Sequence, residues 1–285
     1  MTWDTGFAAE RSQVDEGVHR LPSHGNKTVF IGRDATPYSA RNSSKGALLS
    51  ETHAMFRALA AGKPLEELRF ACVDGKLFRQ SARETRRRIW HALHWRFFAW
   101  TPPRWVTADL ADAACGEMTS PKFIGLVYLH YARRDRLTFD FVGNKLWPLW
   151  RSGSREVRRG DVLDFLAEST SGQRATWRES TRVKLAGNVL SALRDFGLFA
   201  GVQRKALQRP VVVPEVALHL CRLLDAEGLR GRALLEAREW QLFLWGIQDT
   251  SHALAQLAQR GDIRFERSGR TVVLDVVRHS QGETR

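Results

Sequence analysis

The feature that most constrains this chain is one amphipathic helix, which the sequence predicts from Trp177 to Phe196. Thr176-x-x-Glu179 has the pattern of a capping box at its start, and Gly197 suits the position just beyond a helix C-terminus. Apolar side chains recur on one side of this helix and polar side chains on the other. The expected core stripe is Val183, Ala186, Val189, Leu190, Leu193 and Phe196.

The segments on either side of this helix give it a context. A short helix over residues 160–168 and a polar turn over residues 169–172 precede it, and an apolar stretch over residues 198–213 follows it. This is the order of a winged helix-turn-helix. Ser268–Gly269 separates two further apolar segments, which predicts a β-hairpin over residues 263–277. The predicted fold is therefore mainly α, with multi-helix modules, a winged-helix-like segment and small β-hairpins.

Start and stop signals predict the other helices. Ser81-x-x-Glu84 has the pattern of a capping box for a helix that ends at Thr101–Pro102–Pro103, and Ser120–Pro121 predicts the start of the next helix. Residues 214–228 and 234–248 are predicted as two helices, and Asp249 as the cap of a third that ends at Gly261. The chain then divides into a mostly flexible tail (1–42), an N-terminal helical domain (43–153), a winged-helix-like segment (154–214) and a C-terminal helical domain ending in the hairpin (215–285).

Charge and cysteine content narrow the class of protein. The formal net charge is +13, which points to a polyanionic partner such as nucleic acid. The three Cys lie far apart, so they predict neither a disulfide framework nor a zinc site. There is no uninterrupted apolar run of about 18 residues, and residues 1–10 lack the pattern of a signal peptide. We therefore expect a cytoplasmic protein that does not bind membranes.

Side chains that suit contact with DNA gather in several predicted elements. Arg and Lys bind phosphates and guanine edges, Asn reads adenine edges, and Ser and Thr bind either. Polar residues also cover any solvent-exposed helix face, which is the alternative interpretation. Recurrence of arginine in every module favours duplex binding. The candidate DNA-binding residues are Arg86, Arg87, Arg88, Arg174, Arg178, Ser180, Thr181, Arg182, Lys184, Asn188, Ser191, Arg204 and Lys205.

Catalytic signals are weak by comparison. The sequence has no phosphate-binding loop, dinucleotide fingerprint, zinc motif or nucleophile elbow. His91 and His94 share a helix face but have no third metal ligand nearby in sequence. A nuclease-like carboxylate cluster with Lys184 as catalytic cation is an alternative, built from Asp140, Asp161, Asp164, Glu168 and Glu179. We expect no enzymatic activity, no cofactor, no metal and no small-molecule substrate.

Three short segments resemble the BrxA family of BREX (bacteriophage exclusion) phage-defence systems. They are Glu179–Ser180–Thr181–Arg182–Val183–Lys184–Leu185, Arg194–Asp195–Phe196–Gly197–Leu198, and Tyr38 followed by Lys45–Gly46–Ala47–Leu48–Leu49. Together they extend over roughly residues 38–215, and their order and spacing carry the resemblance rather than any single motif. The N-terminal tail and the tryptophan-rich C-terminal part depart from the family pattern.

The resemblance implies a largely helical, DNA-binding accessory protein without known catalytic activity. The host system couples methylation of self DNA to a block on phage replication. By motif match, Leu185 carries over as a core residue, and Ser180, Thr181 and Lys184 as candidate DNA-facing groups. The leading hypothesis is a non-enzymatic, double-stranded-DNA-binding protein that acts with other BREX components. The alternatives are a protein-interaction scaffold that docks such components and a metal-dependent nuclease.

Overall fold

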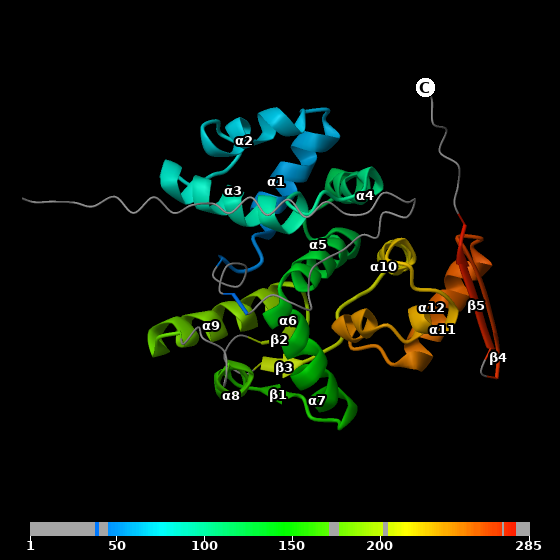
Figure 1. Cartoon of the computed structure of the whole chain (residues 1–285). Coiled ribbons are helices and arrows are strands. Elements are labelled where there is room, and N and C mark those ends of the chain that lie inside the picture. The colour runs from blue at the N-terminus through cyan, green and yellow to red at the C-terminus, as the bar shows by residue number, and fades with distance from the viewer. Residues whose placement is uncertain (1–37, 40–44, 171–176, 202–204, 270, 278–285) are drawn as a thin grey trace, which may run out of the picture.

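The computed structural model describes residues 38–39, 45–170, 177–201, 205–269 and 271–277. Within these ranges the chain is mainly helical, and its two β-sheets are small and antiparallel, which confirms the predicted fold class. Most of the predicted tail over residues 1–42 lies outside the described residues. Figure 1 shows α1 to α4 above α5, with α6 to α9 and three short strands below, and α10 to α12 with a hairpin on the right.

The N-terminal part is a set of helices packed around α5. The helices are α1 (Leu49–Ala60), α2 (Leu65–Val73), α3 (Arg83–Phe97), α4 (Arg104–Cys115) and α5 (Pro121–Arg134). α1 packs against α4, α2 packs against α3, and α5 touches α1, α3 and α4. α5 begins where the sequence predicts, because the Phe123 N–H donates to Ser120 Oγ over 3.2 Å and Pro121 occupies the first turn.

The capping box predicted at Ser81 is wrong. The N-cap of α3 is Ala82, and no side chain caps this helix. Glu84 accepts hydrogen bonds from the guanidinium groups of Arg87 and Arg88 instead of from the helix N-terminus. The α-helix also ends at Phe97, several residues before the predicted Pro stop. α2 and α4 are helices that the sequence analysis did not predict.

The middle part alternates helices with a three-stranded sheet. α6 (Arg136–Phe141) continues through a π-helical turn, η2 (Val142–Leu146), into α7 (Trp147–Arg151). Strand β1 (Glu156–Val157), α8 (Arg159–Thr170), α9 (Glu179–Asp195), β2 (Phe199–Ala200) and β3 (Lys205–Leu207) follow. The sheet order is β1-β3-β2, with Glu156 opposite Ala206 and Phe199 opposite Leu207. α8 packs on α9, and α9 packs on β2.

The C-terminal part repeats the pattern of helices followed by a hairpin. It contains α10 (Pro214–Ala226), α11 (Gly231–Leu235), a 3-10 helix η3 (Arg238–Phe243), α12 (Ile247–Gln259) and the hairpin of β4 (Ile263–Ser268) and β5 (Thr271–Val276). The hairpin and the helix from Pro214 are confirmed. The helix predicted over residues 234–248 is wrong, because the backbone of Leu244 is left-handed, with φ 55°, and interrupts it.

Buried polar side chains join α4, α5 and α10. The two Nε2 atoms of His130 and His219 lie 2.9 Å apart, and His219 Nδ1 lies 2.6 Å from an Asp109 oxygen. Because the carboxylate can only accept, His219 Nδ1 carries the proton and His219 Nε2 accepts from the Nε2–H of His130. Burial is the main cause that lowers the pKa of both imidazoles, and it lowers the pKa of His130 furthest. Both rings are therefore neutral at pH 7.

Candidate nucleic-acid interface

The long helix α9 is positioned by its apolar face. All members of the predicted core stripe except Val183, which is 36% exposed, are buried. Leu185 is buried as well, as the family resemblance implies. Gly197 has φ 85°, its N–H donates to the Arg194 carbonyl, and the next N–H donates to Leu193 O over 2.9 Å. This is a Schellman ending, which confirms the role predicted for Gly197. The helix begins at Glu179 with Arg178 as N-cap, and the predicted cap Thr176 lies outside the described residues.

The opposite face of α9 is polar and almost free of acidic groups. Ser180 and Lys184 are exposed, and Gly187, Asn188 and Ser191 are half-buried along the same strip. A Cβ at Gly187 would meet nothing within 4 Å, so the backbone there is open to an approaching molecule. Phosphates and base edges need small polar and cationic side chains on one accessible strip. This strip provides them at helical spacing.

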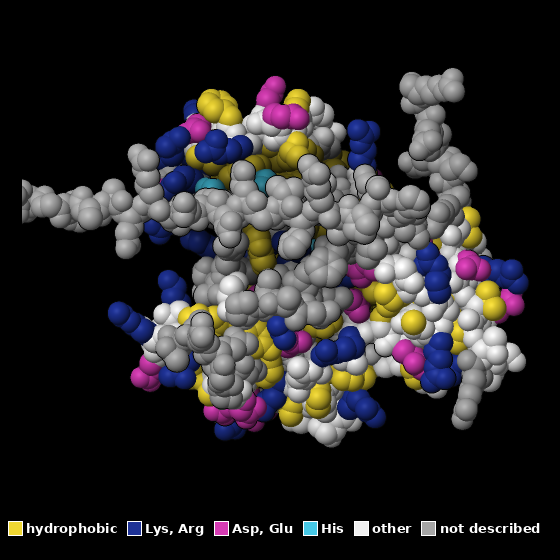
Figure 2. All heavy atoms as spheres, in the orientation of Figure 1, with side chains coloured by type: hydrophobic (Ala, Val, Ile, Leu, Met, Phe, Trp, Pro, Cys, Tyr) yellow, Lys and Arg dark blue, Asp and Glu magenta, His cyan; other side chains and the backbone are white. Residues whose placement is uncertain are grey.

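The cations at the start of α9 have no acidic partner among the described residues. Arg178 and Lys184 are exposed, and Arg182 and Thr181 are half-buried. Arg178, Arg182 and Lys184 make no ion pair with a described side chain. At the far end of the helix, by contrast, Arg194 pairs with Asp195 over 3.1 Å. Figure 2 shows Lys and Arg side chains at the outer end of α9, at the lower left of the view. Their positive charge is therefore available to a polyanion.

A hollow next to this strip adds Arg158 and Arg159, which were not among the predicted residues, to the predicted Lys205. It has a volume of about 470 Å³, and Arg158, Arg159, Gly187 and Lys205 are among the residues that line it. Arg159 is the first residue of α8 and follows β1 closely, and Lys205 is the first residue of β3. Because Val157 of β1 pairs with Lys205, the two cations lie near each other. Arg158 pairs with Glu156 over 3.0 Å, but Arg159 has no described acidic partner. The signal for these residues is tertiary, because neither arginine stands on the predicted long helix.

The arginines of α3 are less available than their sequence suggests. Arg86 donates to the Val73 carbonyl over 2.8 Å and to the carbonyls of Gln80 and Ser81, so it fastens the loop between α2 and α3. Arg87 and Arg88 both bind Glu84 over 2.8 Å. Their hydrogen bonds lower the pKa of the Glu84 carboxyl to about 2. Arg87 and Arg88 are exposed and share one carboxylate, so this pair keeps a net positive charge. Arg86 is held by neutral carbonyl groups, so its Nε and Nη1 donors are already used.

Arg174 and Arg204 lie outside the described residues. Ser191 Oγ accepts a long hydrogen bond of 3.5 Å from Arg194. Asn188 is half-buried on the polar strip, and Lys205 is half-buried at the start of β3.

The carboxylates of the nuclease alternative do not gather. Asp161 accepts the Arg158 N–H over 2.7 Å at the start of α8, and Asp140 binds Tyr38 and Arg136. Across the described ranges, no group of three His, Cys, Asp or Glu side chains could hold a metal ion. His91 and His94 are both exposed on α3, and His94 lies against the ring of Trp90. The arrangement therefore offers no described centre for metal-assisted hydrolysis.

Positive charge is unevenly distributed along the chain. Residues 151–213 contain twelve Lys and Arg against six Asp and Glu, whereas residues 214–277 contain eight Arg against nine acidic residues. In Figure 2, side chains of both signs alternate over the C-terminal part on the right. The excess that a polyanion would meet is therefore concentrated in the first two parts of the molecule.

Comparison with known proteins places the chain in a family. A crystal structure of an uncharacterized protein from Magnetospirillum magneticum is similar, with a TM-score of 0.56 and 18% identity, over 74% of this chain and 100% of that chain. That similarity shows a shared fold only. No curated protein matches this sequence. Among the described residues, no helix is both long and apolar enough to cross a lipid bilayer. The family model for BrxA matches residues 36–223. The chain therefore belongs to the BrxA family, which is associated with BREX phage-defence systems.

Proposed function

We propose that this protein binds double-stranded DNA without acting on it chemically, as an accessory component of a BREX phage-defence system. In this proposal α9 lies in or across the major groove, and strands β2 and β3 belong to the wing. The observation that carries the proposal is the set of cations at the start of α9 and α8 that lack described acidic partners, beside a polar strip open at Gly187.

The order of elements supports this assignment. A strand, two helices and two further strands, with sheet order β1-β3-β2, is the connectivity expected of a winged helix-turn-helix. In that motif the second helix of the pair carries the residues that reach the bases, and here that helix is α9. The start of the preceding helix, with Arg158 and Arg159, would face the phosphate backbone.

The chemistry of the strip favours low sequence specificity. Bidentate base recognition uses Arg, Lys, Asn or Gln, and the central strip of α9 offers only Lys184 and Asn188 of these types. Phosphate contacts from Arg178, Arg182 and Arg159 would then provide most of the binding free energy. Such contacts release counterions, so affinity should fall steeply as the salt concentration rises.

A salt series of duplex binding tests the proposal. With six or more phosphate contacts, the association constant should fall about 10³-fold or more between 50 and 200 mM salt. The double variant Arg178→Glu with Lys184→Glu should lower the slope of log affinity against log salt by about 2, since each lost contact removes about 0.9. Both side chains are exposed, so the fold should be retained.

A matched variant provides the control. Arg69→Glu with Arg104→Glu makes the same change in net charge at two exposed positions on α2 and α4. It should lower affinity much less than the α9 variant. Equal losses would mean that only net charge matters and that α9 is not the interface. Binding that does not depend on salt would contradict the proposal altogether.

A docking role has one specific observation in its favour. On α2, Phe70 is 68% exposed and Leu65 is 45% exposed, which is unusual for large apolar side chains. We propose that this face of α2 contacts another BREX component. Phe70→Ser should abolish capture of that component and leave DNA affinity unchanged, and retained capture would contradict the docking role.

A further inference from the structure

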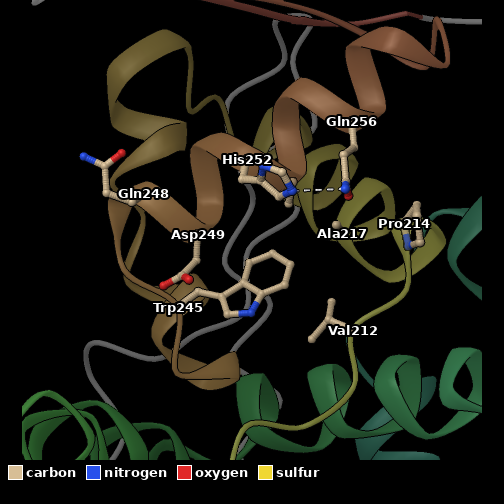
Figure 3. A pocket seen from close by; sticks show the side chains of 9 residues that line it. Val212, Pro214, Ala217, Trp245, Gln248, Asp249, His252 and Gln256 are labelled. Atoms are coloured by element: carbon tan, nitrogen blue, oxygen red, sulfur yellow. Dashed lines mark hydrogen bonds between the residues drawn. The ribbon is translucent and has the colours of Figure 1, made fainter.

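A pocket of about 350 Å³ lies between α10 and α12, away from the polar strip of α9. Its apolar wall comes from Val212, Pro214 and Ala217, and one side of it is the ring of Trp245. Figure 3 shows this ring between Val212 and Asp249, with His252 and Gln256 beyond it on α12 and Gln248 pointing away.

The ring of Trp245 is held in place from behind. It stacks on the buried Trp240 with 5.8 Å between ring centroids and 10° between ring planes. The following residue, Gly246, lies close to Trp147, since a Cβ there would be 3.4 Å from that ring. Trp245 itself is half-buried, so one part of the indole remains accessible. A fixed, partly exposed indole is a surface on which a second flat ring can stack at little cost in conformational entropy.

The polar edge of the pocket has defined donors and acceptors. Gln256 Nε2 and His252 Nε2 lie 3.1 Å apart. Because the amide nitrogen can only donate, His252 Nε2 accepts and His252 Nδ1 carries the proton. Gln256 therefore keeps an accepting oxygen and a second N–H, and His252 keeps a donating N–H. Together they offer two donors and one acceptor at the rim of the pocket.

The pocket carries no uncompensated charge among its described residues. Asp249 binds Arg209 through both carboxylate oxygens, over 2.7 and 2.8 Å, and one of these oxygens also accepts the Gly246 N–H over 2.9 Å. The Arg209 guanidinium lies 5.3 Å from the centre of the Trp150 ring, and Arg155 lies 3.7 Å from it. The interior thus favours an uncharged ligand, while the Arg209 guanidinium stands next to the pocket through its pair with Asp249.

We propose that this pocket binds one nucleobase, stacked on Trp245 and hydrogen-bonded by its edge to Gln256 and His252. A base is flat and uncharged and carries donors and acceptors on its edge, so it can stack on the indole and form hydrogen bonds with these two side chains. Arg209 would contact the phosphate attached to it. The base belongs to a free nucleotide or to an unpaired position in a strand. A proline or aromatic side chain of a peptide would pack against the apolar wall but would form no hydrogen bonds with the Gln256 amide or the His252 imidazole.

Calorimetric titration of the full chain with adenosine monophosphate, uridine monophosphate and ribose 5-phosphate tests the site. At least one nucleotide should bind with a Kd on the order of 0.1–1 mM. Ribose 5-phosphate, which lacks the base, should bind at least 10-fold more weakly. Gln256→Ala should weaken nucleotide binding about 10-fold, and Gln259→Ala, an exposed amide on α12 outside the pocket, should not change it.

The direct test of stacking, Trp245→Ala, would also remove the contact with Trp240 and could therefore disturb the fold. A variant that blocks the pocket and keeps this contact is the better test. Ala253→Phe fills the pocket from a half-buried lining position and should abolish nucleotide binding. Equal binding of ribose 5-phosphate and nucleotides, or full binding by Ala253→Phe, would overturn the proposal. Binding of a proline-rich or aromatic peptide, with no nucleotide binding, would also overturn it.

Binding to two DNA hairpins that differ by one bulged base distinguishes an unpaired base in a strand from a free nucleotide as the ligand. A preference for the bulged hairpin that Ala253→Phe removes assigns the site to unpaired bases, and nucleotide binding without such a preference assigns it to free nucleotides. The Arg178→Glu with Lys184→Glu variant should lose duplex affinity but keep nucleotide binding. Failure of the pocket and failure of the α9 interface are therefore distinguishable.

Discussion

Acid should destabilise this protein through the buried pair His130 and His219. Both imidazoles are neutral in the folded state, and burial holds the pKa of each below its ordinary value of 6.5. The unfolded chain therefore binds protons below pH 6.5 that the folded chain does not, and the free energy of unfolding falls as pH falls. Stability from these groups is fully present above pH 6.5. An imidazole that stays neutral costs about 2 kcal/mol of stability between pH 7 and pH 5, and His130, whose pKa is lowered furthest, is the group that we expect to do so.

Asp135 acts in the opposite direction. Burial raises the pKa of this carboxyl from 3.8 to about 6, so the folded protein takes up a proton below pH 6 that the unfolded chain does not. Its contribution to stability is gained as pH falls and amounts to about 1 kcal/mol at pH 5. The loss from His130 exceeds this gain, and His219 adds to the loss, so the wild-type protein should be less stable at pH 5 than at pH 7.

A comparison of two proteins isolates the imidazole term. His130→Leu removes one titrating group and leaves Asp135 in place, so the pH-dependent loss should be about 2 kcal/mol smaller than in the wild type. Urea unfolding followed by tryptophan fluorescence at pH 7.0 and 5.0, at constant ionic strength, measures both losses. The reasoning is refuted if the two proteins lose the same free energy, because His130 would then not be held neutral in the fold.

Three substitutions test the packing and capping described above. Gly125→Ala should lower the free energy of unfolding by about 1–3 kcal/mol, because its Cβ would lie 2.8 Å from a methyl carbon of Val216 on α10. Gly187→Ala, where nothing lies within 4 Å, should raise it by about 0.5–1 kcal/mol, and a loss there would mean that the α9 strip is covered. Ser120→Ala should cost about 1 kcal/mol, whereas Ser81→Ala should cost almost nothing, since Ser81 does not cap α3. Thermal or urea unfolding measures each change, and equal effects of the two serine variants would contradict the assigned caps.

Local signals predicted the parts of the fold that depend on short-range physics. Ser120 with Pro121 starts α5, Gly197 ends α9 with a left-handed residue, and Ser268–Gly269 joins β4 to β5. The failures arise where tertiary contacts compete with such signals. Glu84 binds two arginines rather than a helix N-terminus. The stack of Trp240 on Trp245 accompanies a break at Leu244 that apolar spacing alone does not reveal.

The candidate interface shows the same division. The polar strip of α9 follows from helical periodicity, so Ser180, Lys184 and Asn188 could be identified from the sequence. Arg159 could not, because it joins this strip only when β1 pairs with β3. Arg86 is a predicted DNA contact because it stands in a cluster of arginines at a helix start, but its three carbonyl contacts form only when the loop before α3 folds around it. Partners of this kind are a property of the folded chain.

The uneven placement of charge has a kinetic consequence. Residues 43–213 hold a large excess of Lys and Arg over Asp and Glu, while residues 214–277 are nearly balanced. A molecule built this way has a permanent electric dipole moment. In the field of a polyanion it experiences a torque that turns its positive end inward before contact. A larger share of collisions then begins in a productive orientation, so added salt should slow association as well as shorten the lifetime of the complex.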